Sequence, residues 1–321
     1  MGMLFAGGEL GDFTAVGSPT FSTTASYHDS DYSRGSINIS SSLYYIIATL
    51  SQTSRQNFLS LQNFTNSTYW ATTILQARDS DGDIVFDITE YSHNDLQLRV
   101  YNSSDTLITS DESVDVGVTA STLNRMTYSA DLSASGNISF TYAGASLLSV
   151  SGDFSGCNDI ASVYIYAPFT SSINTFSEVI ISTGDIRNAR LKTLDLTANG
   201  TTQEWVGDVT DVNAAVTDDA ILISSDTASE VATYAASDLS SGSIPIRAVV
   251  VSPRATRGTT GPQNLSGVVR VSGTNYGQAC NQPPEGLLGS TQAFFETNPD
   301  TAAAWERSAV NAAEFGVRSD T

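Results

Sequence analysis

The feature that most constrains the fold is a succession of short strand-like segments between residues 13 and 186. Within them apolar and polar residues alternate, and turn-forming residues such as Asp81, Gly82 and Gly136 separate one segment from the next. Even spacing of short alternating strands predicts an all-β sandwich or jelly roll. The predicted strands are 36–39, 43–50, 57–64, 69–78, 84–90, 96–101, 106–109, 125–131, 138–143, 147–150, 160–166 and 176–182.

Length and composition agree with a β-protein of two domains. The chain has 321 residues, which exceeds the usual size of one domain, and 40% of them are hydrophobic, which is enough for buried cores. Its one lysine, Lys192, and its abundance of Ser, Thr, Val, Ile and Tyr favour strands over helices. The chain changes in composition near residue 186, where a compact basic cluster follows: Arg187, Arg190 and Lys192. We therefore predict one β-sandwich over residues 1–186 and a second over 187–321.

The charge balance limits the possible partners. A net charge of −20 disfavours nucleic acid and anionic membrane surfaces, because both would be repelled. No apolar run approaches the length of a membrane span, and the first residues lack the basic flank of a secretory signal. Cys157 and Cys280 are too few for a disulfide framework, so we expect free, partly buried thiols.

One group of carboxylates could bind a cation. Asp79, Asp81 and Asp83 alternate with Ser80 and Gly82, and alternating aspartates can direct their oxygens toward one hard cation such as Ca²⁺. The spacing departs from the EF-hand loop, since the glycine falls one place early and no glutamate follows at the twelfth position. The competing interpretation is a solvated hairpin turn. We expect no other cofactor.

Catalytic patterns are weak. Glycoside hydrolysis needs two carboxylates held at a fixed separation. Asp83 and Asp87 would share one strand face, but Glu90 would lie on the opposite face. The sequence therefore predicts a protein that is not an enzyme.

The most distinctive segment of the sequence, residues 246–317, lies in the second domain. Segments 220–224, 228–235, 246–252 and 265–272 read as strands. Asn298 and Pro299 resemble the start of a helix, which Gly316 would end, so we expect a short helical turn near the C-terminus. Arg254, Arg257 and Trp305 are candidate contacts with a neighbouring subunit; the alternatives are solvated loop charges for the arginines and a core position for Trp305.

Two stretches carry a family resemblance. Residues 125–148 form a strand, a turn at Gly136 and a strand ending at Tyr142 and Gly144, and they resemble the hairpin of concanavalin-like and laminin-G-like sandwiches. Residues 184–321 resemble the virion structural proteins of tailed bacteriophages, through cues that include Trp205, Arg254 and Trp305 in that order.

The resemblance implies a non-enzymatic virion structural protein, assembled in the host cytoplasm. We expect a tail appendage, fibre or tail-end component that acts as a symmetric homo-oligomer. Its partners would be other virion proteins and, at the host surface, glycans. A head decoration protein is the second location. The alternative of another class is a carbohydrate-binding lectin or a glycan-active enzyme, because a fold alone does not fix a function.

Overall fold

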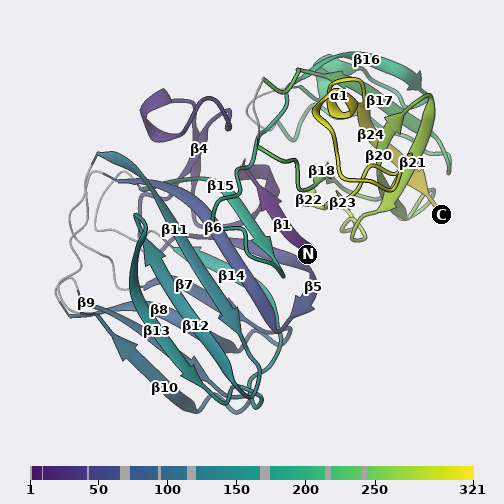
Figure 1. Ribbon diagram of the computed structural model, residues 1–321. Coiled ribbons are helices and arrows are strands. Elements are labelled where there is room, and N and C mark those ends of the chain that lie inside the picture. Colours follow the sequence, from purple (N-terminus) through teal and green to yellow (C-terminus); the bar gives the residue numbers. More distant parts are fainter. Residues whose placement is uncertain are drawn as a thin grey trace. The chain divides into compact units, whose positions relative to one another are not determined.

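The structure is a computed structural model that describes residues 2–8, 10–41, 43–65, 73–92, 95–113, 121–166, 174–213, 218–240 and 244–321. The chain divides into two compact units, Met1–Lys192 and Thr193–Thr321 (Figure 1). Each unit is built from antiparallel strands, so the chain is all-β, with two β-sandwich domains and a short helix near the C-terminus. The division follows Lys192, whereas the sequence placed it after residue 186.

The first domain consists of two large sheets. The eight-stranded sheet has the order β13-β12-β11-β6-β15-β4-β3, with β1 also paired to β15. Its strands are β1 (Met3–Gly7), β3 (Thr20–Ser22), β4 (Ser36–Asn38), β6 (Gln56–Thr65), β11 (Thr122–Asp131), β12 (Gly136–Tyr142), β13 (Ala145–Gly152) and β15 (Asn174–Ser182).

The seven-stranded sheet has the order β10-β9-β8-β7-β14-β5-β2. Its strands are β2 (Thr14–Val16), β5 (Tyr45–Ser54), β7 (Thr73–Arg78), β8 (Ile84–Ser92), β9 (Asp95–Tyr101), β10 (Leu107–Glu112) and β14 (Ile160–Tyr166). Every predicted strand of this domain has a counterpart, although residues 69–72 of one prediction lie outside the described residues. Sequence reasoning missed β1, β2 and β3, and two 3-10 turns, Leu10–Asp12 and Ala25–Tyr27, complete the domain.

Alternation explains why these segments pair as a sandwich. In β9, Leu96, Leu98 and Val100 are fully buried while the residues between them are partly exposed. The inward residues of both sheets form one continuous core, in which the rings of Phe86 and Tyr128 meet edge to face at 5.1 Å. Burying each large apolar side chain contributes about 1.5–3 kcal/mol, so this core is the main source of the domain's stability.

A buried ion cluster holds the segment that follows β15. Glu178 is fully buried, has a left-handed φ of 53° and lies where the register of β15 with β6 shifts. Its carboxylate accepts hydrogen bonds from Nε and Nη2 of Arg190, at 2.6 and 2.7 Å, and Arg125 lies 3.6 Å away. Arg190 also pairs with Asp29 at 2.7 Å and covers the ring of Tyr32. These contacts keep residues 183–192 on the first domain, which is why the division follows Lys192.

The second domain has a five-stranded sheet and two small ribbons. The sheet has the order β16-β17-β24-β20-β21, and the ribbons are β18-β23 and β19-β22. The strands are β16 (Leu196–Gln203), β17 (Val231–Ala236), β18 (Val249–Val251), β19 (Arg254–Ala255), β20 (Asn264–Val271), β21 (Thr274–Ala279), β22 (Gly289–Ser290), β23 (Ala293–Phe295) and β24 (Glu314–Asp320). A 3-10 turn spans Val209–Asp211.

One face of this sheet packs against the β18-β23 ribbon. Val269 and Val271 of β20 share an apolar cluster with Ala293 and Phe295 of β23. The close approach requires a glycine on β20, because a Cβ atom added to Gly267 would lie 2.5 Å from the Ala293 methyl group. The layers therefore form a small sandwich.

Three predictions for the second domain are wrong. The helix α1 spans Arg307–Asn311 and does not start at Asn298, whose side chain instead accepts a hydrogen bond from the Asp300 amide in a turn. Gly316 does not end a helix; it lies in β24 between β17 and β20. Residues 220–224 form no strand and contribute only an isolated bridge from Ser224 to Val206. Local apolar patterning could not reveal the long-range pairing that draws residues 314–320 into a sheet.

Candidate functional site

The aspartate turn between β7 and β8 is built around Asp79. The Asp79 side chain is only 5% exposed, and its Oδ1 atom accepts hydrogen bonds from the backbone amides of Asp81 and Asp83, both at 2.9 Å. Its Oδ2 atom accepts a hydrogen bond of 2.6 Å from Nδ2 of Asn158. Gly82 adopts a left-handed φ of 92° within the turn. The Asp79 carboxylate thus serves to close the hairpin.

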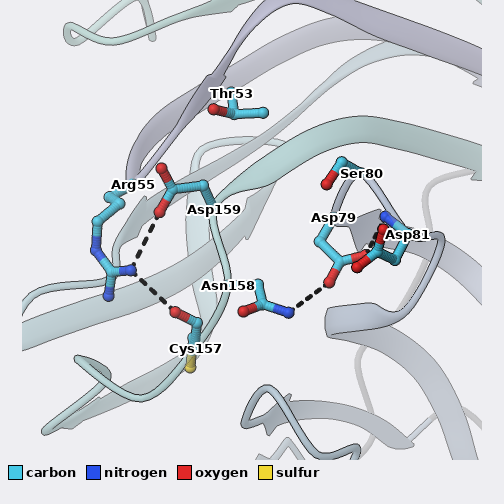
Figure 2. Close-up of a pocket in the computed structure, with 8 residues that line it drawn as sticks. All are labelled: Thr53, Arg55, Asp79, Ser80, Asp81, Cys157, Asn158 and Asp159. Carbon is cyan, nitrogen blue, oxygen red and sulfur yellow. Dashed lines mark hydrogen bonds and ion pairs between the residues drawn. The ribbon is translucent and has the colours of Figure 1, made fainter.

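An open pocket of about 330 Å³ lies beside this turn (Figure 2). It is lined by residues of the β5–β6 hairpin, the aspartate turn and the segment before β14: Thr53, Arg55, Asp79, Ser80, Asp81, Cys157, Asn158 and Asp159. Arg55 donates to the carbonyl oxygen of Cys157 at 2.9 Å and to Oδ1 of Asp159 at 3.1 Å. Its other donors reach the carbonyl oxygens of Leu132 and Phe154. The hydrogen bonds of Arg55 beside this pocket therefore connect separate segments of the first domain to one another.

The structure does not gather the three aspartates into a metal centre. Among the described residues, no group of three or more His, Cys, Asp or Glu side chains is arranged to hold a metal ion. Electrostatic repulsion from Asp105, with contributions from burial, Asp79 and Asp81, raises the pKa of Asp83. The turn is thus an acidic edge of the domain whose first carboxylate is already committed to hydrogen bonds.

A second candidate surface lies on the outer face of the seven-stranded sheet. Strand β14 alternates there, with Val163 and Ile165 in the core and Tyr164 and Tyr166 partly exposed on the outside. Tyr164 is in register with Gln76 of β7, Gln76 with Asp87 of β8, and Asp87 with Arg99 of β9. Directly paired residues project from the same face, so this register places one continuous row of polar and aromatic side chains across the strands.

Two members of this row and three neighbouring side chains form a group of five, here called the tyrosine platform: Tyr45, Tyr164, Tyr166, Gln76 and Arg78. The ring of Tyr45 lies 4.9 Å from that of Tyr166 and 5.4 Å from that of Tyr164, between centroids. The Tyr166 hydroxyl donates to Oε1 of Gln76 at 2.9 Å. The Arg78 guanidinium lies 4.5 Å above the centre of the Tyr164 ring. All five side chains are partly exposed, so they can contact a ligand.

Next to the platform, Asp87 and Arg99 form a bidentate ion pair. Asp87 is 1% exposed, and its Oδ1 and Oδ2 atoms accept hydrogen bonds from Nε and Nη2 of Arg99 at 2.9 and 2.6 Å. Burial raises the pKa of Asp87, and the hydrogen bonds from Arg99 oppose that rise. Asp87 and Glu90 lie on opposite faces of β8, since Asp87 is in register with Arg99 on the outer face and Glu90 with the buried Leu96. These two carboxylates do not form a facing pair.

Arg254 and Arg257, which the sequence proposed as contacts with a neighbouring subunit, both bind side chains of their own domain. Arg254 makes two hydrogen bonds to Asp219, at 2.7 and 2.8 Å. Arg257 donates from Nη1 to Oε1 of Gln263 at 2.7 Å and pairs with Glu285 at 3.0 Å.

Trp305 lies in the core and not on the surface. It is 4% exposed, and its Nε1 atom donates to the Phe295 carbonyl oxygen at 2.7 Å. Its position agrees with the core alternative drawn from the sequence, because the ring belongs to the apolar cluster around β20 and β23.

Both cysteines are free thiols. Cys157 is buried, Cys280 is partly exposed, and burial raises the pKa of each thiol.

Sequence reasoning missed the tyrosine platform. The alternation of Ser162, Tyr164 and Tyr166 was visible, but the sequence does not state that β14 lies between β5 and β7. Tyr45 and Tyr166 are more than a hundred residues apart in the chain and meet only through this pairing. A search for alternating aromatic residues on predicted strands would have flagged Tyr164 and Tyr166 on β14, and also the buried Phe140 and Tyr142 on β12, but not their neighbours in the sheet.

No protein-family model and no curated protein sequence matches the chain. Similar solved structures include the cellulose-induced protein Cip1, with 14% identity over 55% of this chain and 93% of that chain and a TM-score of 0.41. The binding domain of botulinum neurotoxin serotype C1 shows 10% identity over 87% of this chain and 74% of that chain, with a TM-score of 0.40. An endo-β-1,4-glucuronan lyase from the fungus Trichoderma reesei shows 11% identity over 57% and 96%, with a TM-score of 0.38.

No helix in the described part of the chain has the length and hydropathy to cross a bilayer.

Proposed function

We propose that the first domain is a non-catalytic glycan-binding module and that its ligand lies on the tyrosine platform. The observation that carries this proposal is the gathering of Tyr45, Tyr164 and Tyr166 on the outer face of two adjacent strands. A tyrosine offers an apolar ring for the non-polar face of a sugar and a hydroxyl for its polar edge. Gln76 and Arg78 add an amide and a guanidinium as hydrogen-bonding groups for sugar hydroxyls.

The extent of the row suits an oligosaccharide. From Tyr164 on β14 to Arg99 on β9, the paired residues cross three strand spacings, which is roughly 14 Å at the usual separation of neighbouring strands. A ligand that lies across the strands would contact Tyr164, Gln76 and Arg99, which are partly exposed, and would pass over the buried Asp87. This arrangement supports recognition of several linked sugars and not of a single one.

The non-catalytic part of the proposal is supported by the state of Asp87. Both of its carboxylate oxygens accept hydrogen bonds from Arg99, and the side chain is 1% exposed. A carboxylate that is already paired and out of reach of solvent is poorly placed to attack a sugar or to transfer a proton to it. On this surface, the ion pair serves to hold β8 and β9 in register.

A glycan array tests the proposal, with wild-type protein compared with a Tyr45→Ala/Tyr166→Ala variant. Wild-type protein should bind a subset of oligosaccharides, and the variant should lose at least about tenfold in affinity, as expected for removal of central aromatic contacts. A matched Tyr276→Ala variant removes a tyrosine of the second domain and should leave the profile unchanged. Absence of any bound glycan, or an unchanged profile for the double variant, would reject the proposal.

We further propose, from the resemblance of residues 184–321 to phage virion proteins alone, that the chain is a virion structural protein. A tail appendage, fibre or tail-end component is the first location and a head decoration protein the second. Glycan binding by a tail component would then contact the host surface, and a symmetric homo-oligomer would multiply weak contacts. Mass spectrometry of purified particles tests this context, and its failure to detect the chain would remove the virion assignment.

A further inference from the structure

We propose that the tyrosine platform selects oligosaccharides that carry an anionic substituent, a carboxylate or a sulfate, and that Arg78 is the residue that binds the anion. This inference rests on the proposed function, because it names the ligand class of the same surface. It concerns specificity, which depends on what the platform adds to stacking and hydroxyl contacts.

The first observation is that Arg78 is unusual among the arginines of an acidic chain. With 34 acidic and 14 basic residues, most arginines that the structure describes have a carboxylate partner. Ion pairs engage Arg55, Arg99, Arg125, Arg187, Arg190, Arg254, Arg257, Arg270 and Arg318. The hydrogen-bond acceptors of Arg78 are neutral, namely Oε1 of Gln76 and the carbonyl oxygen of Gly82. Within the described residues, Arg78 therefore retains a positive charge that no carboxylate contacts directly.

The second observation is that Arg78 has more N–H donors than these hydrogen bonds use. A guanidinium carries five N–H groups. Two of them, on Nε and Nη2, bond to Gln76 at 3.2 and 2.6 Å, and one on Nη1 bonds to Gly82 at 2.9 Å. Five less three leaves one N–H on each terminal nitrogen. N–H groups on both terminal nitrogens can bind the two oxygens of a carboxylate or of a sulfate.

The third observation is that the guanidinium is already held in position. Gln76 fixes one edge, Gly82 fixes another, and the ring of Tyr164 supports its face at 4.5 Å. Gln76 also accepts the Tyr166 hydroxyl, so the cation is joined to the aromatic part of the platform. A long side chain that is ordered before binding loses less conformational entropy when the ligand arrives.

Neighbouring charges determine how strong this selection is. Arg99 contributes little to attraction because Asp87 neutralises it. The exposed carboxylates of the aspartate turn oppose an anionic ligand, and Asp83 directly follows Gly82, whose carbonyl oxygen Arg78 contacts at 2.9 Å. The same proximity gives a second test, since removal of the Asp83 charge should strengthen binding of an anionic ligand and leave a neutral one unaffected.

The experiment is a glycan array that contains matched pairs: oligogalacturonates with their methyl esters, and sulfated oligosaccharides with their unsulfated forms. Wild-type protein should bind the charged member of a pair at least about tenfold more tightly, the scale of a charge-assisted contact. Arg78→Gln should abolish this difference and Asp83→Asn should enlarge it. Arg187→Gln, which alters an exposed arginine of the same domain, is the matched control and should change neither. The two kinds of pair show whether carboxylate or sulfate is preferred.

Each outcome decides the inference. Equal binding of charged and neutral members, or a wild-type profile for folded Arg78→Gln protein, would overturn it and leave glycan binding by the platform intact. Loss of all binding in Tyr45→Ala/Tyr166→Ala, together with loss of only the charge preference in Arg78→Gln, would support both proposals. Melting temperatures of all variants show that they are folded. Absence of glycan binding by wild-type protein would instead reject the proposed function itself.

Discussion

The buried ion cluster of the first domain leads to the most demanding stability prediction. Replacement of Glu178 by Gln keeps the shape of the side chain and removes its charge. The Nε and Nη2 atoms of Arg190 would then face an amide at positions where a carboxylate now accepts both at 2.6 and 2.7 Å. Arg125, 3.6 Å away, would lose its only acidic neighbour within ion-pair distance among the described residues.

The magnitude follows from burial. Glu178 is fully buried, and both arginine side chains are about four-fifths buried, at 21% and 22% exposure. Removal of one partner from a buried pair costs about 3–5 kcal/mol, because the remaining charge stays out of water. Glu178 also has a left-handed φ of 53°, and a strained backbone of this kind persists only while its surroundings enforce it. For a domain of this size the loss corresponds to a melting temperature lowered by roughly 6–20 °C.

Differential scanning calorimetry of the full chain measures this effect on the transition of the first domain. Asp185→Asn is the matched control, because it breaks an ion pair with Arg187 whose side chains are 64% and 48% exposed. That pair should contribute at most about 1 kcal/mol. If Glu178→Gln lowered the melting temperature no more than the control, the cluster would not hold the domain as we infer.

Three further predictions concern particular residues. Gly82→Ala should lower the free energy of unfolding by about 1–2 kcal/mol in urea titrations, because φ is 92° there and only glycine adopts it without strain. Trp305→Phe should cost about 1 kcal/mol through its lost hydrogen bond to Phe295, and Trp305→Ala about 3–5 kcal/mol through its cavity, both measured by chemical denaturation. Burial raises the pKa of Tyr142 and Tyr234 to about 12 from 10, so each stabilises the fold below pH 10. That stability, on the order of 3 kcal/mol per residue, is lost as pH rises toward 12. Urea titrations followed by circular dichroism across that range should therefore show a smaller pH-dependent loss of stability in Tyr142→Phe and Tyr234→Phe than in wild-type protein, and an unchanged loss in both variants would contradict this.

The strands of the first domain were predictable because their signals are local. Alternation along β9 and β14 and turn residues such as Gly82 are readable within a few positions of each other. The second domain was harder, because β24 pairs with β17 and β20 through residues that are distant in the chain. The segment around Gly316 has no strong alternation of its own, so its place in the sheet depends on tertiary pairing.

The candidate site was predictable only in part. The aspartate turn was found from its sequence. The hydrogen bonds that the Asp79 carboxylate accepts from the amides of Asp81 and Asp83 are evident only from the structure. The tyrosine platform depends on the order of β5, β14 and β7 in the sheet, which no local pattern encodes. Similarly, the ion pairs of Arg254 and Arg257 join loops whose proximity the sequence does not specify.

The most direct test of glycan binding by the platform is nuclear magnetic resonance titration of the protein with the tightest oligosaccharide from the array. We predict that chemical-shift changes concentrate on Tyr45, Gln76, Arg78, Tyr164 and Tyr166 and extend along the row toward Arg99. Changes centred on the pocket beside Asp79 and Asn158, or confined to the second domain, would contradict the account.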